Sequence, residues 1–192
     1  MKKSTVISII SVVLIVPILF GLYTENFIVR DADLYTILLL ILGFSLLLFI
    51  GKIINYFGFN NYDIELMRRH DVINAFINNN RIVLWIFFPV TMIMEELIFR
   101  YYLISFLATT LQLKLILSIL ISSIAFSLYH IHTWFSYKSQ AILLINLSYT
   151  LLLGFYLGCL FYTLGFIVCI LIHYLIALYL YYNLYRKNFR KI

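Results

Sequence analysis

The sequence predicts an all-α polytopic membrane protein, a bundle of about six transmembrane helices that forms one domain over residues 1–192. Composition is the first observation, because 64% of the residues are hydrophobic, 11% carry a charge and mean hydropathy is +1.02. A soluble domain is about 45–50% apolar and about 25% charged, so lipid must cover much of this chain. Continuous apolar runs of about twenty residues are the second observation, and they favour helices over the alternating strands of a membrane barrel.

Six apolar segments predict the six helices, and each is near the ~20 residues that a helix needs to cross the hydrocarbon core. They cover residues 5–23, 34–54, 82–109, 115–130, 141–162 and 166–185. The first follows two lysines, as in a signal peptide, but it lacks an A-x-A-like cleavage site, so we expect an uncleaved helix. The third could enter the core near Pro89, a good first-turn residue, or begin at Ile82.

One long polar connection, residues 52–81, separates the second and third segments. Within it, apolar residues at positions 64, 66 and 67 are followed directly by Arg68 and Arg69. An apolar face next to basic residues is typical of a helix that lies on a membrane surface near anionic lipid. The pattern therefore predicts either a short interfacial helix or an ordinary loop.

The basic residues predict that both termini are cytoplasmic. With that orientation, eleven of the fourteen Lys and Arg residues lie inside, Arg30 and Lys114 lie outside, and Arg100 lies within the membrane. The net charge of +6 thus comes from helix ends and indicates a lipid bilayer, not a nucleic acid, as the partner. The inside residues are Lys2, Lys3, Lys52, Arg68, Arg69, Arg81, Lys138, Arg186, Lys187, Arg190 and Lys191.

Three ionisable residues fall inside the third segment, in MEELIFRYYL: Glu95, Glu96 and Arg100. A charge at the centre of a membrane helix costs about 2.5–3.5 kcal/mol, so three together need a reason. Glu96 and Arg100 are four residues apart and can form an ion pair on one helix face. Glu95 points about 100° away from Glu96, and therefore needs a partner on another helix.

Two histidines are the candidate partners of Glu95: His130 ends the fourth segment and His173 lies inside the sixth. The three side chains could converge in the cytoplasmic half of the bundle, more readily if the third helix enters near Pro89. A carboxylate and an imidazole in one cavity can activate water, and a second imidazole can stabilise an oxyanion. A polar network that only joins the helices, or a proton relay, would use the same residues.

The remaining reactive or polar residues have ordinary structural interpretations. We expect Cys159 and Cys169 to be small buried hydrophobic residues, since their spacing fits neither a disulfide framework nor a zinc finger. We expect His132 to face away from His130 on a shared helix, and His70 in the polar connection to be solvated. The tyrosines at the end of the last segment, Tyr181, Tyr182 and Tyr185, are typical interfacial anchors.

EELIFR, from Glu95 to Arg100, has the pattern EExxxR, and FSLYH, from Phe126 to His130, has the pattern FxxxH. HYLIA supplies His173, the first residue of a pattern HxxxN. These three motifs resemble those of the CPBP intramembrane proteases, also called the CAAX-protease and bacteriocin-processing or Abi family. The resemblance covers residues 88–178, where the motifs occur in the family's order and in consecutive apolar segments.

The resemblance implies an endopeptidase that hydrolyses a peptide bond in a membrane-associated protein or peptide, for which a prenylated CAAX protein is one candidate. It implies that Glu95 and His130 activate water, that His173 helps to hold the oxyanion, and that Glu96, Arg100 and Phe126 support the site. We favour catalysis without a metal or other cofactor. A zinc ion held by Glu95, His130 and His173 is the chemical alternative.

Ala177 is the departure from the family pattern, because it stands where HxxxN has asparagine. A missing amide would remove one oxyanion donor, which can cost about 10²–10³ in rate, unless Tyr174 or Tyr179 replaces it. The alternative function is therefore a catalytically weak or inactive membrane regulator or immunity-type scaffold. A proton-coupled transporter comes third, because the segments show no inverted repeat.

Overall fold

The computed structural model describes residues 3–24 and 33–190, and all regular secondary structure in these two ranges is helical. The predicted all-α class is confirmed. Three of the basic residues used to predict the topology, Lys2, Arg30 and Lys191, lie outside the described residues. The α-helices are α1 (Lys3–Leu19), α2 (Leu34–Phe57), α3 (Asn61–Met67), α4 (Asp71–Ile77), α5 (Phe88–Glu96), α6 (Leu115–Tyr129), α7 (His132–Tyr137) and α8 (Gln140–Asn188).

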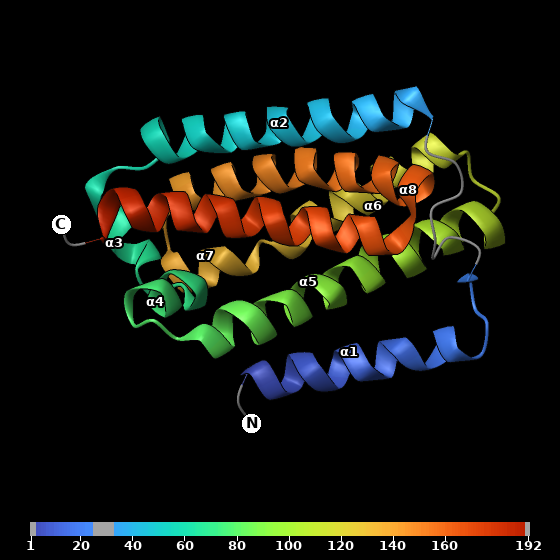
Figure 1. Cartoon of the computed structure of the whole chain (residues 1–192), viewed down its shortest axis with the longest axis horizontal. Coiled ribbons are helices and arrows are strands. Elements are labelled where there is room, and N and C mark those ends of the chain that lie inside the picture. The colour runs from blue at the N-terminus through green and yellow to red at the C-terminus, as the bar shows by residue number, and fades with distance from the viewer. Residues whose placement is uncertain (1–2, 25–32, 191–192) are drawn as a thin grey trace.

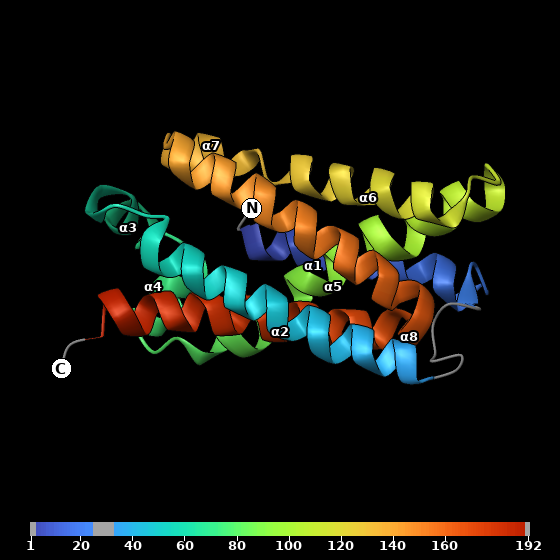
Figure 2. The same ribbon diagram turned by 90° about the horizontal axis from the view of Figure 1, so that it is seen from above.

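The long helices lie lengthwise beside one another, with α8 packed against both α2 and α6 (Figure 1). The short helices α3, α4 and α7 gather at the end of the bundle where α8 finishes. In the view turned by 90°, the first part of α8 crosses obliquely beneath α6 and α7 (Figure 2). Both the first and the last turns of α8 therefore lie beside the short helices.

Helix α8 folds back on itself at Gly165 and consists of two arms, residues 140–164 and 166–188. Gly165 has φ 80° and ψ 177°, a backbone conformation that is essentially restricted to glycine. The two arms run in opposite directions (Figure 1). The arms correspond to the fifth and sixth apolar segments, so the predicted break between those segments is confirmed.

Three described helices are long and apolar enough to cross a membrane: Leu34–Phe57, Leu115–Tyr137 and Gln140–Asn188. The helix at Thr5–Leu19 is apolar but shorter. Many large apolar side chains on α2 are exposed, among them Leu34, Phe49 and Phe57. Such a surface is stable in lipid and not in water, so the chain is an integral membrane protein. The total of six crossings stays a prediction.

The third apolar segment is helical from before Pro89 to Thr110, with wide π-helical turns at η2 (Val83–Phe87), η3 (Leu97–Ile104) and η4 (Phe106–Thr110). Of the two starts left open by the sequence, the one at Ile82 agrees with the structure, in which residues 81 and 82 are already helical, and the one near Pro89 does not. Proline lacks an N–H and crowds the carbonyl four residues earlier, and a wider turn relieves both problems. Consistent with this, the N–H of Phe88 donates to the carbonyl of Val83, five residues back.

The polar connection contains two short helices, α3 and α4, so of the two alternatives for residues 64–67, a short helix or an ordinary loop, the structure has the helix. Its contact with lipid stays a prediction. Asn60 caps the start of α3 by accepting from the N–H of Asp63, and the Asp63 carboxylate accepts from Ser139 Oγ at 2.6 Å. Asp63 and Ser139 are both buried, and Ser139 caps α8. This contact fixes the polar connection against the first turn of α8.

Helices α6 and α8 approach closely where glycine removes the side chain. A Cβ atom on Gly154 would lie 3.1 Å from Cα of Ser123, closer than backbone atoms normally allow. One turn further on, Ser127 Oγ donates to the carbonyl of Leu147 at 2.7 Å. The approach places the end of α6, with Phe126 and His130, directly against α8. Helix α6 stops at Tyr129, and after a short turn the chain continues as α7.

Candidate active site

Glu96 is the centre of a buried polar cluster. Its side chain is 0% exposed and lies at the end of α5, where the helix widens into η3. Oε1 of Glu96 is 3.0 Å from Nη1 of Arg100, so the predicted ion pair between positions 96 and 100 is confirmed. Two further donors reach the same carboxylate from the second arm of α8: Nδ1 of His173 at 2.7 Å and Sγ of Cys169 at 3.0 Å.

His173 connects the two acidic residues of the third segment. Because its Nδ1 donates to Glu96, its Nε2 faces Glu95, and Nε2 lies 3.9 Å from Oε2 of Glu95. Sequence reasoning expected Glu95 and His173 to converge, and the structure brings them together. It did not foresee that the shorter contact of His173 is with Glu96.

Phe126 joins the histidines to the buried arginine. Its fully buried ring lies 4.8 Å from the His130 ring, 5.7 Å from the His173 ring and 4.0 Å from Cζ of Arg100. Nδ1 of His130 is 2.8 Å from the carbonyl of Phe126, so Nδ1 carries the proton and donates. The other ring nitrogen of neutral His130, Nε2, is therefore a hydrogen-bond acceptor.

Glu95, His130, His173 and Ala177 line one cavity of about 200 Å³. The other lining residues are mostly apolar and include Phe59, Met67, Ile145, Leu153, Leu180 and Leu184. A carboxylate, two imidazoles and apolar surroundings are suited to holding a water molecule beside an apolar substrate chain.

His132 lies beside His130, so the prediction that it faces away is wrong. The two ring centroids are 5.8 Å apart, and both rings line the cavity. The prediction assumed one continuous helix through both residues, but α6 ends at Tyr129 and α7 begins at His132. The intervening turn brings the two rings to the same side.

His70 and Tyr181 also line the cavity, although sequence reasoning made the first a solvated residue and the second an interfacial anchor. The two rings stack with centroids 4.4 Å apart and Tyr181 Oη is 3.0 Å from His70 Nε2, so His70 packs against α8 and is only partly exposed, contrary to the prediction. The interfacial position of Tyr181 stays a prediction. Tyr174 and Tyr179 do not line the cavity: the Tyr174 hydroxyl donates to the carbonyl of Leu84, and Tyr179 is 40% exposed.

Cys169 is more than the small hydrophobic residue that its apolar surroundings predicted, because its thiol donates to Glu96. Its spacing holds the missed signal, since it lies four residues before His173 and eight before Ala177, on one helix face. Cys159 packs at the edge of the hydrophobic core, as expected.

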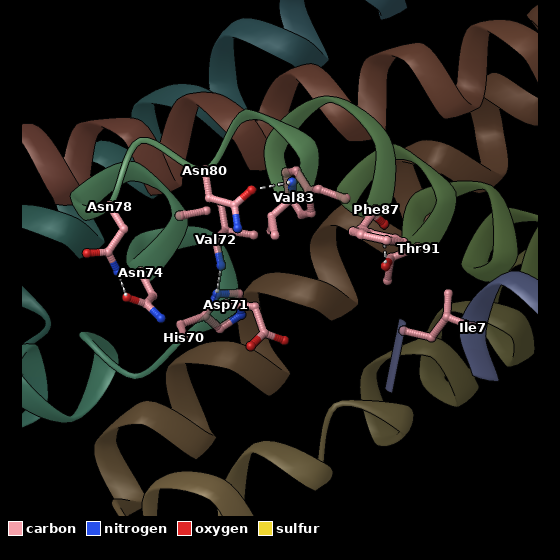
Figure 3. Close-up of a pocket in the computed structure, with 12 residues that line it drawn as sticks. Ile7, His70, Asp71, Val72, Asn74, Asn78, Asn80, Val83, Phe87 and Thr91 are labelled. Carbon is pink, nitrogen blue, oxygen red and sulfur yellow. Dashed lines mark hydrogen bonds between the residues drawn. The ribbon is translucent and has the colours of Figure 1, made fainter. Parts of the chain in front are cut away.

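A second cavity, of about 400 Å³, adjoins the first, since His70 and Phe88 line both. Figure 3 shows its polar side chains on α4 and the loop after it, with Ile7 of α1 facing them across the opening. His70 Nδ1 accepts the N–H of Val72 there at 3.2 Å, which caps the start of α4.

No group of three or more His, Cys, Asp or Glu side chains in residues 3–24 and 33–190 is arranged to hold a metal ion. Because the bond to Glu96 uses Nδ1 of His173 and leaves Nε2 toward Glu95, the alternative of zinc on Glu95, His130 and His173 stays a prediction.

Comparison with known proteins gives one family. The model of the Rce1-like type II CAAX prenyl endopeptidases matches residues 77–179, which include all three motifs. No curated protein and no solved structure matches the chain. The matched range covers more than half of the 192 residues and holds the whole buried cluster of Glu95, Glu96 and His173. The family inferred from the motifs is confirmed, and the chain belongs to the Rce1-like type II CAAX prenyl endopeptidase family.

Proposed function

We propose that this protein is an intramembrane endopeptidase that hydrolyses a peptide bond in a membrane-associated substrate of the CAAX type. The observation that carries the proposal is the meeting of Glu95 and His173, 3.9 Å apart on the wall of a cavity that His130 also lines. Buried ionisable groups in a membrane helix are costly and indicate a functional site.

In the proposed reaction, Glu95 and His130 activate a water molecule. The acceptor nitrogen Nε2 of His130 orients one water hydrogen, and the Glu95 carboxylate takes the other as a proton. The resulting hydroxide forms a bond to the carbonyl carbon of the peptide. The electrons of the C=O double bond move to its oxygen, which becomes an oxyanion.

His173 supports the oxyanion in this proposal. Glu96 accepts from Nδ1 of His173 and holds the ring so that Nε2 faces Glu95 and the cavity. In the imidazolium form Nε2 donates to the oxyanion, and the Glu96 carboxylate compensates the positive charge of the ring. As the C–N bond breaks, Glu95 returns its proton to the leaving nitrogen, so the products are an amine and a carboxylic acid, which then ionises in water.

Ala177 favours the second candidate function, a catalytically weak or inactive regulator or immunity-type scaffold. It lines the cavity with Glu95, His130 and His173, at the position where the family motif has asparagine. A scaffold would keep the cluster for packing and would tolerate Glu95→Gln, which retains the shape of the side chain and removes the base.

The test compares protein termini in membranes from cells that carry the native chain or Glu95→Gln at matched expression. The proposal predicts termini that occur only with the native chain. These identify substrates, and a purified farnesylated CAAX peptide in proteoliposomes then provides a direct assay. Identical termini, together with a deletion phenotype that Glu95→Gln rescues, would favour the scaffold.

We also propose six crossings, with both termini in the cytoplasm. One end of the bundle holds α3, α4, α7 and the last turn of α8 (Figure 1). Most basic residues lie on or next to these elements, so the positive-inside rule makes this end cytoplasmic in our proposal. Single cysteines in a variant lacking Cys159 and Cys169 provide the test. Arg69→Cys should react with an impermeant maleimide only after the cells are opened to expose the cytoplasmic side. Lys114→Cys should already react in intact cells.

A further inference from the structure

The cavity lacks the amide that the family motif would provide at position 177, and among the described residues another cavity side chain has the chemistry to replace it. An oxyanion donor must be an N–H or O–H group that faces the reacting carbonyl and is not committed to another acceptor. Tyr181 lies one helical turn beyond Ala177 and lines the same cavity. Its hydroxyl has one hydrogen-bond partner in the described part of the chain, Nε2 of His70.

The direction of that hydrogen bond follows from the cap of α4. Nδ1 of His70 accepts the N–H of Val72 (Figure 3), so Nδ1 carries no proton. Neutral imidazole has one proton, which must then be on Nε2. Nε2–H therefore donates to Tyr181 Oη, 3.0 Å away. The hydroxyl proton of Tyr181 is not used in this bond and can be donated to another acceptor.

Tyr181 and Ala177 both line the cavity, one helical turn apart. Long side chains on a helix generally tilt toward its N-terminus and cover the preceding turn. For Tyr181 the preceding turn holds Ala177, so we expect the phenol to lie over position 177. The stacked His70 ring holds that phenol on one face, and Phe88 packs edge-on with ring centroids 5.9 Å apart. The phenol is therefore held in one orientation.

We propose that Tyr181 is a catalytic residue of this protein, the oxyanion donor that replaces the missing asparagine, with His70 as the positioning residue that orients its hydroxyl. The inference rests on the proposed endopeptidase function. A phenol on an apolar wall stabilises a developing oxyanion as an amide does, because both present one polar hydrogen in a site that excludes water. Ala177 and Tyr181 together then make a site different from the family pattern.

The test measures cleavage of a farnesylated, fluorescence-quenched CAAX peptide by purified protein in proteoliposomes. Tyr181→Phe keeps the ring and removes only the hydroxyl, so we expect kcat to fall about 10²-fold with KM unchanged. Tyr182→Phe is the matched control, since Tyr182 is exposed and does not line the cavity. It should cleave at the native rate.

Two further variants separate an oxyanion role from a packing role. Ala177→Asn in the Tyr181→Phe background restores the amide of the family motif and should recover much of the lost kcat. His70→Asn retains a side chain that caps α4 but lacks the Nε2–H donor, so its kcat should lie between those of the native chain and Tyr181→Phe. Thermal midpoints in detergent should match the native value for Tyr181→Phe.

The outcomes distinguish this inference from the proposed function. If the native chain cleaves the peptide and Tyr181→Phe has the same kcat, with or without a change in KM, the role of Tyr181 is overturned. The endopeptidase function then stands. If the native chain cleaves no peptide and adds no termini in membranes, the proposed function falls, and the role of Tyr181 falls with it.

Discussion

Nδ1 of His173 lies 2.7 Å from the same carboxylate oxygen of Glu96 that Arg100 contacts at 3.0 Å. One buried oxygen atom thus joins the third apolar segment to the sixth. Arg100 needs this carboxylate because an unpaired charge inside a membrane bundle is costly. The same carboxylate orients His173, because a bond at Nδ1 turns the ring so that Nε2 faces Glu95. Glu96 therefore serves the stability of the bundle and the geometry of the site at once.

Replacement of Glu96 by glutamine should destabilise the protein strongly. Glu96→Gln leaves the buried Arg100 without its counter-charge, and breaking a buried pair from one side costs about 3–5 kcal/mol. The measurement is the free energy of unfolding in detergent micelles. Glu65→Gln is the matched control, since Glu65 pairs with Arg68 at 3.2 Å with both side chains exposed. An exposed pair contributes about 0–1 kcal/mol, so equal losses in the two variants would contradict the role of Glu96.

Loss of His130 should affect the chemical step more than substrate binding. His130→Ala removes the acceptor that we propose orients the water, and removal of such a group lowers kcat by about 10²–10⁴. Cleavage of the farnesylated peptide at several concentrations separates kcat from KM. His132→Ala is the comparison, because its ring lines the same cavity 5.8 Å from His130. A larger loss in His132→Ala would reverse the assignment of the two histidines.

Gly165→Ala should weaken the fold at the turn between the two arms of α8. With φ 80° and ψ 177°, any side chain at this position is strained, at a cost of about 1–3 kcal/mol. Unfolding in detergent, followed by circular dichroism, gives the change. Ser148→Ala, at an exposed position on the same helix, should change stability by no more than about 0.5 kcal/mol. A Gly165→Ala variant as stable as Ser148→Ala would argue against the turn.

The two cysteines should differ in their effects. Cys169→Ala removes a buried donor to Glu96, and we expect a loss of about 0.5–2 kcal/mol with a lower rate of peptide cleavage. Cys159→Ala removes a partly buried thiol that packs at the edge of the core, so it should leave cleavage unchanged. Unfolding and cleavage measured on both variants provide the check. Equal cleavage by Cys169→Ala and the native chain would show that the thiol does not position Glu96.

Much of the architecture could be predicted from local patterns. The apolar runs anticipated α2, α6 and both arms of α8, and the spacing of Glu96 and Arg100 anticipated their ion pair. The start of the third segment could not be read in this way, because Pro89 favours a helix start and yet is accommodated by a π-helical turn. The environment of His132 could not be predicted either, because the direction of its side chain relative to His130 depends on where α6 ends.

What the sequence by itself determined is therefore local: an apolar helical chain, three motifs, the 96–100 ion pair and a family. What only the tertiary structure decided is which groups meet across helices. His173 bonds to Glu96 in addition to facing Glu95, Cys169 joins the same carboxylate, and His70 stacks on Tyr181. The physical reason is that helical periodicity fixes side-chain directions only within one helix. The rotation and tilt of each helix against its neighbours depend on contacts far apart in the chain, such as that of Gly154 with Ser123.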